Sequence, residues 1–139
     1  MKYLFWAAIA FTLFSIGCSS TVVYSSTPGQ KDKQKPKQDY NGWDEMTASF
    51  YGEEHHGKLT ANGETFDMYA MTCAHKTLDF NTVLILINPD NGNSIEVRVN
   101  DRGPFIEGRD IDLSWGAAKK LGMLNDGVKT LKVKIKPNT

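Results

Sequence analysis

The chain has 139 residues, which is enough for one domain with a hydrophobic core of its own. Its 16 Lys and Arg residues balance its 16 Asp and Glu residues, so the formal net charge at pH 7 is zero. This balance argues against nucleic acid or another polyanion as a partner and favours an uncharged or weakly charged one.

The first 17 residues have the features of a secretory signal peptide. Lys2 precedes an apolar run that is too short to span a bilayer, which requires about 20 helical residues. The run ends in Ser-Ile-Gly-Cys at residues 15–18, which resembles the lipobox of bacterial lipoproteins, although Ser15 stands where Leu is usual. We expect residues 1–17 to be removed and Cys18 to carry lipid. An ordinary secretory peptide or an uncleaved anchor is the alternative.

Residues 18–44 are predicted to be this lipidated cysteine and a flexible linker, because they are rich in Ser, Thr, Gln, Lys and Pro. Several acyl chains on Cys18 would hold the protein at a membrane stably. Ser19 after the cysteine suits sorting to the outer membrane in many Gram-negative bacteria. The expected location is therefore the bacterial cell envelope. Once Cys18 is lipidated, Cys73 is the remaining cysteine, and its apolar neighbours predict a buried thiol without a catalytic role.

The following part, residues 45–136, is predicted to be one all-β domain. Six segments have the β-branched, apolar or alternating patterns of strands: residues 46–52, 69–74, 82–88, 94–99, 111–113 and 128–135. Asn91-Gly92 predicts a hairpin between the third and fourth of them. Ser114 is the expected N-cap of a two-turn helix over residues 115–121, which Gly122 ends.

The third segment, residues 82–88, is apolar without alternation, which is typical of a strand that is buried on both faces or belongs to a closed barrel. A polar loop covers residues 53–63. Six short strands with one or two short helices favour a small closed barrel, because closure leaves few free sheet edges.

The fourth strand runs into Asn100-Asp101-Arg102-Gly103-Pro104. Gly103 has no Cβ and Pro104 fixes φ, so the backbone after Asp101 is predicted to be left-handed or sharply bent. A carboxyl group on such a stiff corner is suited to holding a proton in place. The competing interpretation is a turn that Asp101 caps with its own side chain.

Six blocks of the sequence together resemble the rare lipoprotein A family of bacterial cell-wall proteins. The blocks are residues 48–52, 56–64, 66–68, 74–78, 97–105 and 111–114. The resemblance implies a double-psi β-barrel, the fold shared with expansins and with one class of lytic transglycosylases. It also implies an endolytic transglycosylase activity on peptidoglycan. Many members carry a C-terminal SPOR module; because the sequence ends at Thr139, we expect none here, which leaves septal localisation in doubt.

The resemblance implies a catalytic cluster of Glu64, Asp67, His75 and Asp101. A lytic transglycosylase protonates the glycosidic oxygen between N-acetylmuramic acid and N-acetylglucosamine, and the muramoyl 6-hydroxyl then closes on C1 to form a 1,6-anhydro sugar. One carboxyl group can perform both proton transfers, whereas hydrolases use two. We assign Asp101 as the acid and then the base. In the alternative, Glu64 is the acid and Asp101 stabilises the positive charge at C1, and the sequence does not decide between them.

The other members of the predicted site have open alternatives. His75 either orients a carboxylate or is a structural hydrogen-bonding residue, and Asp67 either belongs to the site or caps a turn. Arg102 is expected to face the substrate or a backbone carbonyl, since it would otherwise lower the pKa of Asp101. Phe50 is either a sugar platform or part of the core. The predicted substrate-binding residues are Tyr51, Thr60, Asn62, Arg102 and Phe105.

The predicted function is therefore a lytic transglycosylase, with a non-catalytic, expansin-like peptidoglycan-binding lipoprotein as the alternative. A third possibility is a structural envelope lipoprotein, which would expose an apolar patch away from the cluster. The expected partners are peptidoglycan strands and a membrane reached through the lipid, with the protein a monomer. No cofactor is expected, and His55-His56 is not predicted to bind metal because adjacent residues rarely face one ion.

Overall fold

The computed structural model describes residues 39–137. The predicted signal peptide, Cys18 and the linker up to residue 38 lie outside the described residues. The elements run in the order β1 (Asp44–Tyr51), η1 (Glu53–His55), β2 (Thr72–His75), β3 (Val83–Ile87), β4 (Ser94–Asp101), β5 (Ile111–Ser114), α1 (Trp115–Leu121) and β6 (Lys129–Ile135). Within residues 39–137, no helix is both long enough and apolar enough to cross a membrane.

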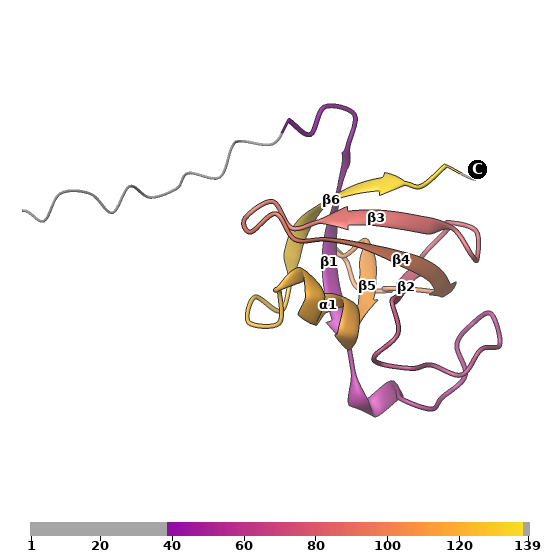
Figure 1. Ribbon diagram of the computed structural model, residues 1–139. Helices are drawn as coiled ribbons and strands as arrows, with labels where there is room; N and C mark the ends of the chain where they lie inside the picture. Colours follow the sequence, from indigo (N-terminus) through magenta and orange to yellow (C-terminus); the bar gives the residue numbers. More distant parts are fainter. Residues whose placement is uncertain (1–38, 138–139) are drawn as a thin grey trace, which may run out of the picture. The chain divides into compact units, whose positions relative to one another are not determined.

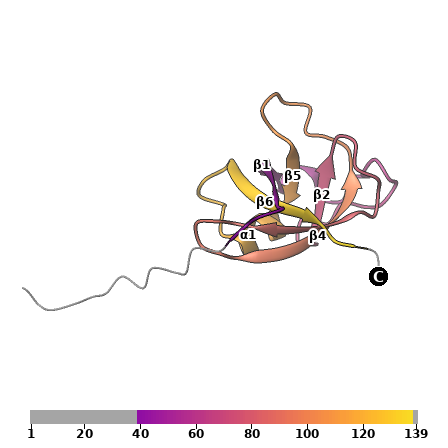
Figure 2. The same ribbon diagram turned by 90° about the horizontal axis from the view of Figure 1, so that it is seen from above.

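The six strands form one closed barrel, in which the neighbours follow the order β1-β5-β2-β4-β3-β6 and β6 returns to β1 (Figures 1 and 2). Two pairs, β1 with β5 and β2 with β4, are parallel, whereas the other four pairs are antiparallel. The predicted six-stranded barrel with a short helix is confirmed. In these parallel pairs the end of β1 lies beside β5 and the end of β4 lies beside β2. The candidate site lies at these strand ends.

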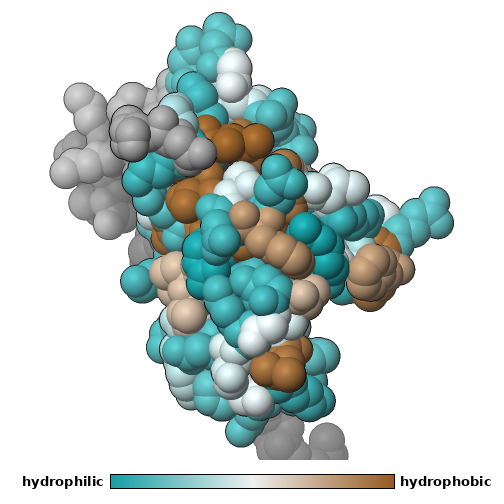
Figure 3. Space-filling view, turned by 90° about the vertical axis from the view of Figure 1, so that its right-hand side faces the viewer, coloured by the Kyte–Doolittle hydropathy of each residue, from teal (hydrophilic) through white to brown (hydrophobic). Residues whose placement is uncertain are grey.

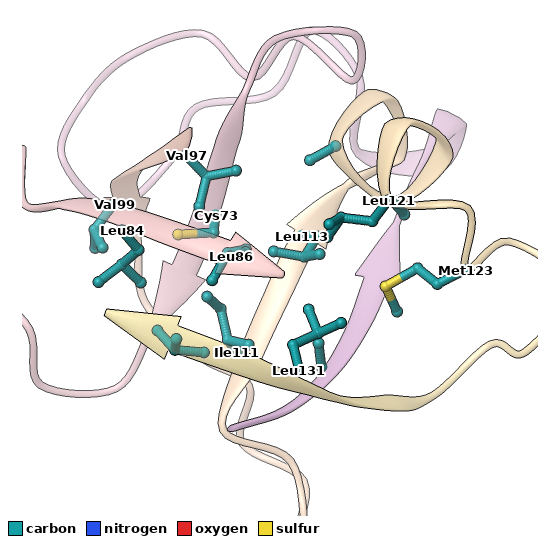
Figure 4. Close-up of a cluster of buried hydrophobic side chains, with 14 residues drawn as sticks. Cys73, Leu84, Leu86, Val97, Val99, Ile111, Leu113, Leu121, Met123 and Leu131 are labelled. Atoms are coloured by element: carbon teal, nitrogen blue, oxygen red, sulfur yellow. The ribbon is translucent and has the colours of Figure 1, made fainter. Parts of the chain in front are cut away.

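The interior of the barrel is filled by apolar side chains from all six strands and from α1, as Figure 4 shows. Leu84 and Leu86 of β3 are fully buried while their neighbours are half-buried, so the apolar run of this strand lies in a closed barrel as predicted. Cys73 is fully buried among these side chains, and burial raises the pKa of its thiol to about 12. The thiol is therefore a small core group, as expected.

Helix α1 begins and ends at the predicted residues. The Ser114 hydroxyl accepts a hydrogen bond from the amide of Ala117, and Gly122 has a φ of 70° in the left-handed region that ends the helix. In Figure 1 the helix lies beside the lower end of β1, and the connection of residues 52–71 hangs below the barrel.

Several strand boundaries differ from the prediction by one to three residues. β2 begins at Thr72, because residues 67–70 form a turn in which Asp67 accepts hydrogen bonds from the amides of Tyr69 and Ala70. β1 begins at Asp44, two residues before the predicted start. The Nζ atom of Lys134 in β6 lies 5.9 Å from the ring centre of Trp43. Trp43, just before β1, thus contacts the barrel.

Candidate active site

A pocket of about 140 Å³ opens where the ends of β1 and β4 meet β2 and β5. Its lining comes from Tyr51, His55, Ala74, Asp101, Arg102 and Asp112. Three of the predicted site residues, Tyr51, Asp101 and Arg102, therefore come together here. Asp112 is an acid that the sequence analysis did not assign to the site.

A bulge in β4 decides where Asp101 points. Val97 and Val99 face the core, and strict alternation would turn Asp101 to the same side. However, β2 pairs Cys73 with Val99 and then Ala74 with Asp101, so Asn100 is an extra residue in β4. A bulge changes the face to which the following side chains point. Asp101 consequently lines the pocket outside the core.

Asp101 and Asp112 lie on either side of Ala74. Ala74 pairs with Asp101 across the parallel β2–β4 ladder and with Asp112 across the antiparallel β2–β5 ladder. Neighbouring strands are about 4.8 Å apart, so the Cα atoms of the two aspartates are separated by roughly 10 Å, with only a methyl group between them. This arrangement gives the pocket two carboxylates on one face of the sheet.

The carboxylate of Asp101 is held by two backbone amides. Its Oδ1 accepts hydrogen bonds from the N–H of Ala61 at 2.9 Å and from the N–H of Arg102 at 2.8 Å. Gly103 follows with a φ of 129°, which confirms the predicted left-handed bend. Because both amides engage Oδ1, this oxygen is fixed in orientation.

The side chain of Arg102 turns to backbone carbonyls, one of the two predicted orientations. Its Nη1 donates to the carbonyl oxygens of His75 at 3.2 Å and Leu78 at 2.9 Å. The guanidinium also lies 3.8 Å from the ring centre of Phe80, in a cation–π contact. Arg102 therefore borders the pocket while its charge is directed at these carbonyl groups.

The second pocket carboxylate, Asp112, belongs to a chain of polar contacts. The hydroxyl of Ser49 donates to its Oδ1, and Arg109 Nη1 donates to the Ser49 hydroxyl at 3.3 Å. Asp112 lies between the buried Ile111 and Leu113, so its side chain points to the opposite side of β5. In the sequence Asp112 is only a charged residue between two core residues, a pattern that does not place it beside Asp101.

The hydroxyl of Tyr51 is buried and has no hydrogen-bond partner among the described residues. The ring packs on Phe66, with 4.6 Å between the ring centres, and meets the His55 ring edge-on at 5.4 Å. Burial and, next, the charge of Asp101 raise the pKa of Tyr51 well above its usual range. The phenol group of Tyr51 is therefore neutral. Tyr51 was predicted to stack on a sugar ring, and one face of its own ring already packs on Phe66.

Glu64 belongs to a separate polar cluster on the outer side of β4. Its two carboxylate oxygens accept hydrogen bonds from Arg98 Nη1 and Nη2, both at 2.8 Å. Asn62 Nδ2 donates at 3.0 Å and Asn100 Nδ2 at 3.1 Å. The hydrogen bonds from Arg98, followed by those from the two amides, lower the pKa of Glu64 to about 2. Its two oxygens are thus occupied by these donors, and Glu64 does not line the pocket, which argues against it as the proton donor.

The remaining predicted residues have structural contacts away from the pocket lining. His75 Nδ1 accepts hydrogen bonds from the amides of Thr77 and Leu78, and mainly burial lowers its pKa. Asp67 accepts the amide of Tyr69 at 2.9 Å, as a turn residue does. His75 Nδ1 and Asp67 Oδ1 thus make the contacts expected of a structural residue, because both atoms accept hydrogen bonds from backbone amides.

The polar and aromatic residues predicted to bind sugar differ in exposure. The hydroxyl of Thr60 is buried and donates to Asn62 Oδ1 at 2.6 Å, so these two residues form part of a turn. Phe50 packs against the core, which decides between its two alternatives. Phe105 is 82% exposed and remains available for a ligand. On the face shown in Figure 3, apolar side chains form separate small groups among hydrophilic ones.

Comparisons with solved structures place the barrel among double-psi folds. The expansin of Clavibacter michiganensis, in its apo form, aligns with a TM-score of 0.56 and 19% identity over 70% of this chain and 52% of that chain. Cerato-platanin 3 from M. perniciosa aligns with a TM-score of 0.52 and 11% identity over 68% of this chain and 95% of that chain. At these identities the likeness concerns the fold alone, and it confirms the predicted double-psi β-barrel.

Comparisons of sequence give closer relatives. The chain is 58% identical over 87 residues to the endolytic peptidoglycan transglycosylase RlpA of Pseudomonas aeruginosa (strain UCBPP-PA14), which covers 63% of this chain and 26% of that protein. It is 52% identical over 88 residues to the protein of the same name in Vibrio cholerae, covering 63% of this chain and 34% of that protein. The chain thus spans about a quarter to a third of the length of these curated relatives.

The family comparison agrees with the six sequence blocks identified above. The profile described as lytic transglycolase matches residues 44–134, which run from the first residue of β1 to within one residue of the end of β6. This range contains the pocket and the cluster around Glu64. The chain therefore belongs to the lytic transglycolase family, and its resemblance to rare lipoprotein A is confirmed.

Proposed function

We propose that this protein is an endolytic lytic transglycosylase that cleaves the bond between N-acetylmuramic acid and N-acetylglucosamine in peptidoglycan. The observation that carries the proposal is the pair of carboxylates, Asp101 and Asp112, on the two sides of Ala74 in one open pocket. The relatives that are 52–58% identical over this domain bear the name of that activity, which supports the same chemistry here.

In the proposed reaction, Asp101 donates its proton to the glycosidic oxygen while the bond from C1 to that oxygen breaks. The muramoyl 6-hydroxyl then forms a bond to C1, and its proton passes to the Asp101 carboxylate. The acid is thereby restored, and the product is a 1,6-anhydro sugar. Because an internal hydroxyl replaces water, one carboxyl group serves both transfers.

Asp112 is the proposed stabiliser of the positive charge that develops at C1. It lies in the pocket, whereas the carboxylate of Glu64 bonds Arg98. A fixed negative charge near a developing positive charge lowers the barrier electrostatically. Phe105, which is largely exposed just after the Asp101 turn, is proposed to contact a sugar ring.

The test is mass spectrometry of the sugars that the purified protein releases from peptidoglycan, both intact and stripped of stem peptides by an amidase. We expect anhydro-muramic products from the wild type and at least a hundredfold less from Asp101→Asn, because a general acid typically contributes 10²–10⁴-fold. Asp112→Asn is expected to lose activity as well. Glu107→Gln, an exposed substitution, is the control.

If neither substrate yields soluble product while the protein still co-sediments with intact sacculi, the transglycosylase proposal is wrong. The expansin-like binding function then remains. Release of product from the stripped peptidoglycan but not from the intact one would instead identify stem peptides as an obstacle to binding.

We also propose the domain layout and location expected from the sequence: a signal peptide at residues 1–17, a lipidated Cys18 with linker to residue 44, and the barrel over residues 45–136. Action on peptidoglycan requires placement in the cell envelope, and lipid on Cys18 would tether a monomer there. Labelled palmitate should enter the wild-type protein and not Cys18→Ala. Equal labelling of both proteins would exclude Cys18 as the lipid site.

A further inference from the structure

Glu64 is the most extensively bonded carboxylate of the cluster outside the pocket. Arg98 bonds both of its oxygens, and the side-chain amides of Asn62 and Asn100 add one hydrogen bond each. Two parallel N–H···O bonds between a guanidinium and a carboxylate fix the relative orientation of the groups. Asn81 Oδ1 accepts from the same Arg98 Nη1 at 3.0 Å, which fixes the arginine in turn.

This ion pair fastens a tight turn, residues 60–64, to the outer side of β4. Within the turn, the amide of Thr60 donates to the carbonyl of Glu64 at 2.8 Å, and the amide of Glu64 donates to Asn62 Oδ1 at 3.1 Å. The amide of Asn62 donates to the carbonyl of Asn100 at 3.3 Å. The turn is therefore bound to β4 through both its backbone and the Glu64 side chain.

The same turn carries the amide that holds Asp101. Ala61 N–H, between Thr60 and Asn62, donates to Asp101 Oδ1 at 2.9 Å. The turn and Asp101 are 40 residues apart in sequence, and the contacts of the turn with β4 help to bring them together. Any movement of the turn away from Arg98 moves this donor away from the carboxylate.

We infer that Glu64 is a positioning residue, which acts through the turn of residues 60–64 to keep the Ala61 amide on Asp101 Oδ1. With Oδ1 fixed by Ala61 and Arg102, Oδ2 is the oxygen that remains to exchange the proton with substrate. Glu64 itself neither donates nor accepts that proton. The inference rests on the proposed function for its catalytic consequence, but the structural link to Ala61 does not.

The experiment compares Glu64→Gln, Arg98→Gln and the double variant, with Glu96→Gln as the matched control. Glu96 lies on the same strand and pairs with Lys136 at 2.9 Å, away from the pocket lining. The double variant removes both charges, so neither Glu64 nor Arg98 is left as an ion without its partner. Two readouts are needed: the solvent-exchange rate of the Ala61 amide by NMR, and kcat and KM for anhydro-product release.

Each single variant should speed exchange of the Ala61 amide at least tenfold and lower kcat by roughly 10- to 100-fold, because displacement of a catalytic group by 1 Å can cost about 100-fold. KM should change less than twofold, since Glu64 does not line the pocket. The double variant should recover part of both properties, because it leaves no unpaired ion at the turn. The control should match the wild type.

A proton-transfer role for Glu64 predicts a different pattern. Arg98→Gln would then stay active, while Glu64→Gln and the double variant would both be inactive, and this result would overturn the inference. An unchanged Ala61 exchange rate in a folded Glu64→Gln protein would overturn it as well. Should the wild type release no anhydro product, the proposed function fails, and the exchange rates alone decide whether Glu64 positions the turn.

Discussion

At the residue scale, the buried hydroxyl of Tyr51 is the clearest sign that the pocket is built for a ligand. A buried polar atom without a partner costs about 1–3 kcal/mol. The Tyr51 hydroxyl has none among the described residues, although two aspartates line the same pocket. Such a group can be satisfied when a substrate or a reacting group supplies the missing hydrogen bond.

Tyr51→Phe is therefore expected to affect stability and activity in opposite directions. Removing the unpartnered hydroxyl should leave the free energy of unfolding unchanged or raise it by up to about 1 kcal/mol, measured by urea denaturation. Release of anhydro products should fall about tenfold, the cost of one lost hydrogen bond of about 1.4 kcal/mol to the transition state. Tyr69→Phe, which changes an exposed tyrosine, is the control. A Tyr51→Phe protein that is both destabilised by more than that amount and fully active would contradict this view.

At the scale of the elements, local patterns determined what could be predicted. Ser114 and Gly122 define α1 because caps depend on neighbouring residues, and Asn91-Gly92 marks the hairpin for the same reason. The bulge at Asn100 and the ion pair from Arg98 to Glu64 depend on strands far apart in sequence. Alternation in one strand contains no information on its partner, so Asp112 and the true environment of Glu64 were visible only in the structure.

Helix α1 offers a prediction in which local propensity and packing disagree. Ala is favoured over Gly in a helix by about 1 kcal/mol. At Gly116, however, a Cβ would lie 2.5 Å from the backbone oxygen of Tyr69, and the amide of Gly116 donates to the carbonyl of Met68 at 2.8 Å. Gly116→Ala should thus destabilise the protein by about 1–3 kcal/mol, as overpacking does.

Thermal unfolding of Gly116→Ala and Lys120→Ala provides the measurement. Lys120 is exposed on the same helix, so its substitution tests helix propensity without a steric contact. The expected result is a lower Tm for Gly116→Ala and an unchanged or slightly higher Tm for Lys120→Ala. If Gly116→Ala raises the Tm, the turn at Tyr69 yields to the methyl group and is not a rigid neighbour of the helix.

At the scale of the whole molecule, closure of the barrel makes its stability depend on the groups that connect distant segments. β6 pairs with β1 on one side and β3 on the other, so the chain segment nearest the C-terminus completes the barrel. The 16 basic and 16 acidic residues balance at neutral pH, but protonation of the carboxylates leaves a strongly positive chain. Acid should therefore unfold the barrel, and the paired carboxylates set the pH at which this happens.

Glu64 is the carboxylate with which this pH dependence can be tested. Its pKa is lowered from 4.5 to about 2, chiefly by Arg98, so the folded state favours the ionised form. The resulting stabilisation is fully present above pH 4.5 and is lost as the pH falls towards 2. The Tm of the wild type should exceed that of Glu64→Gln at pH 7, and the difference should shrink steadily between pH 4.5 and 2. A difference that is the same at pH 7 and pH 2.5 would show that the lost stability comes from packing of the turn rather than from the charge of Glu64.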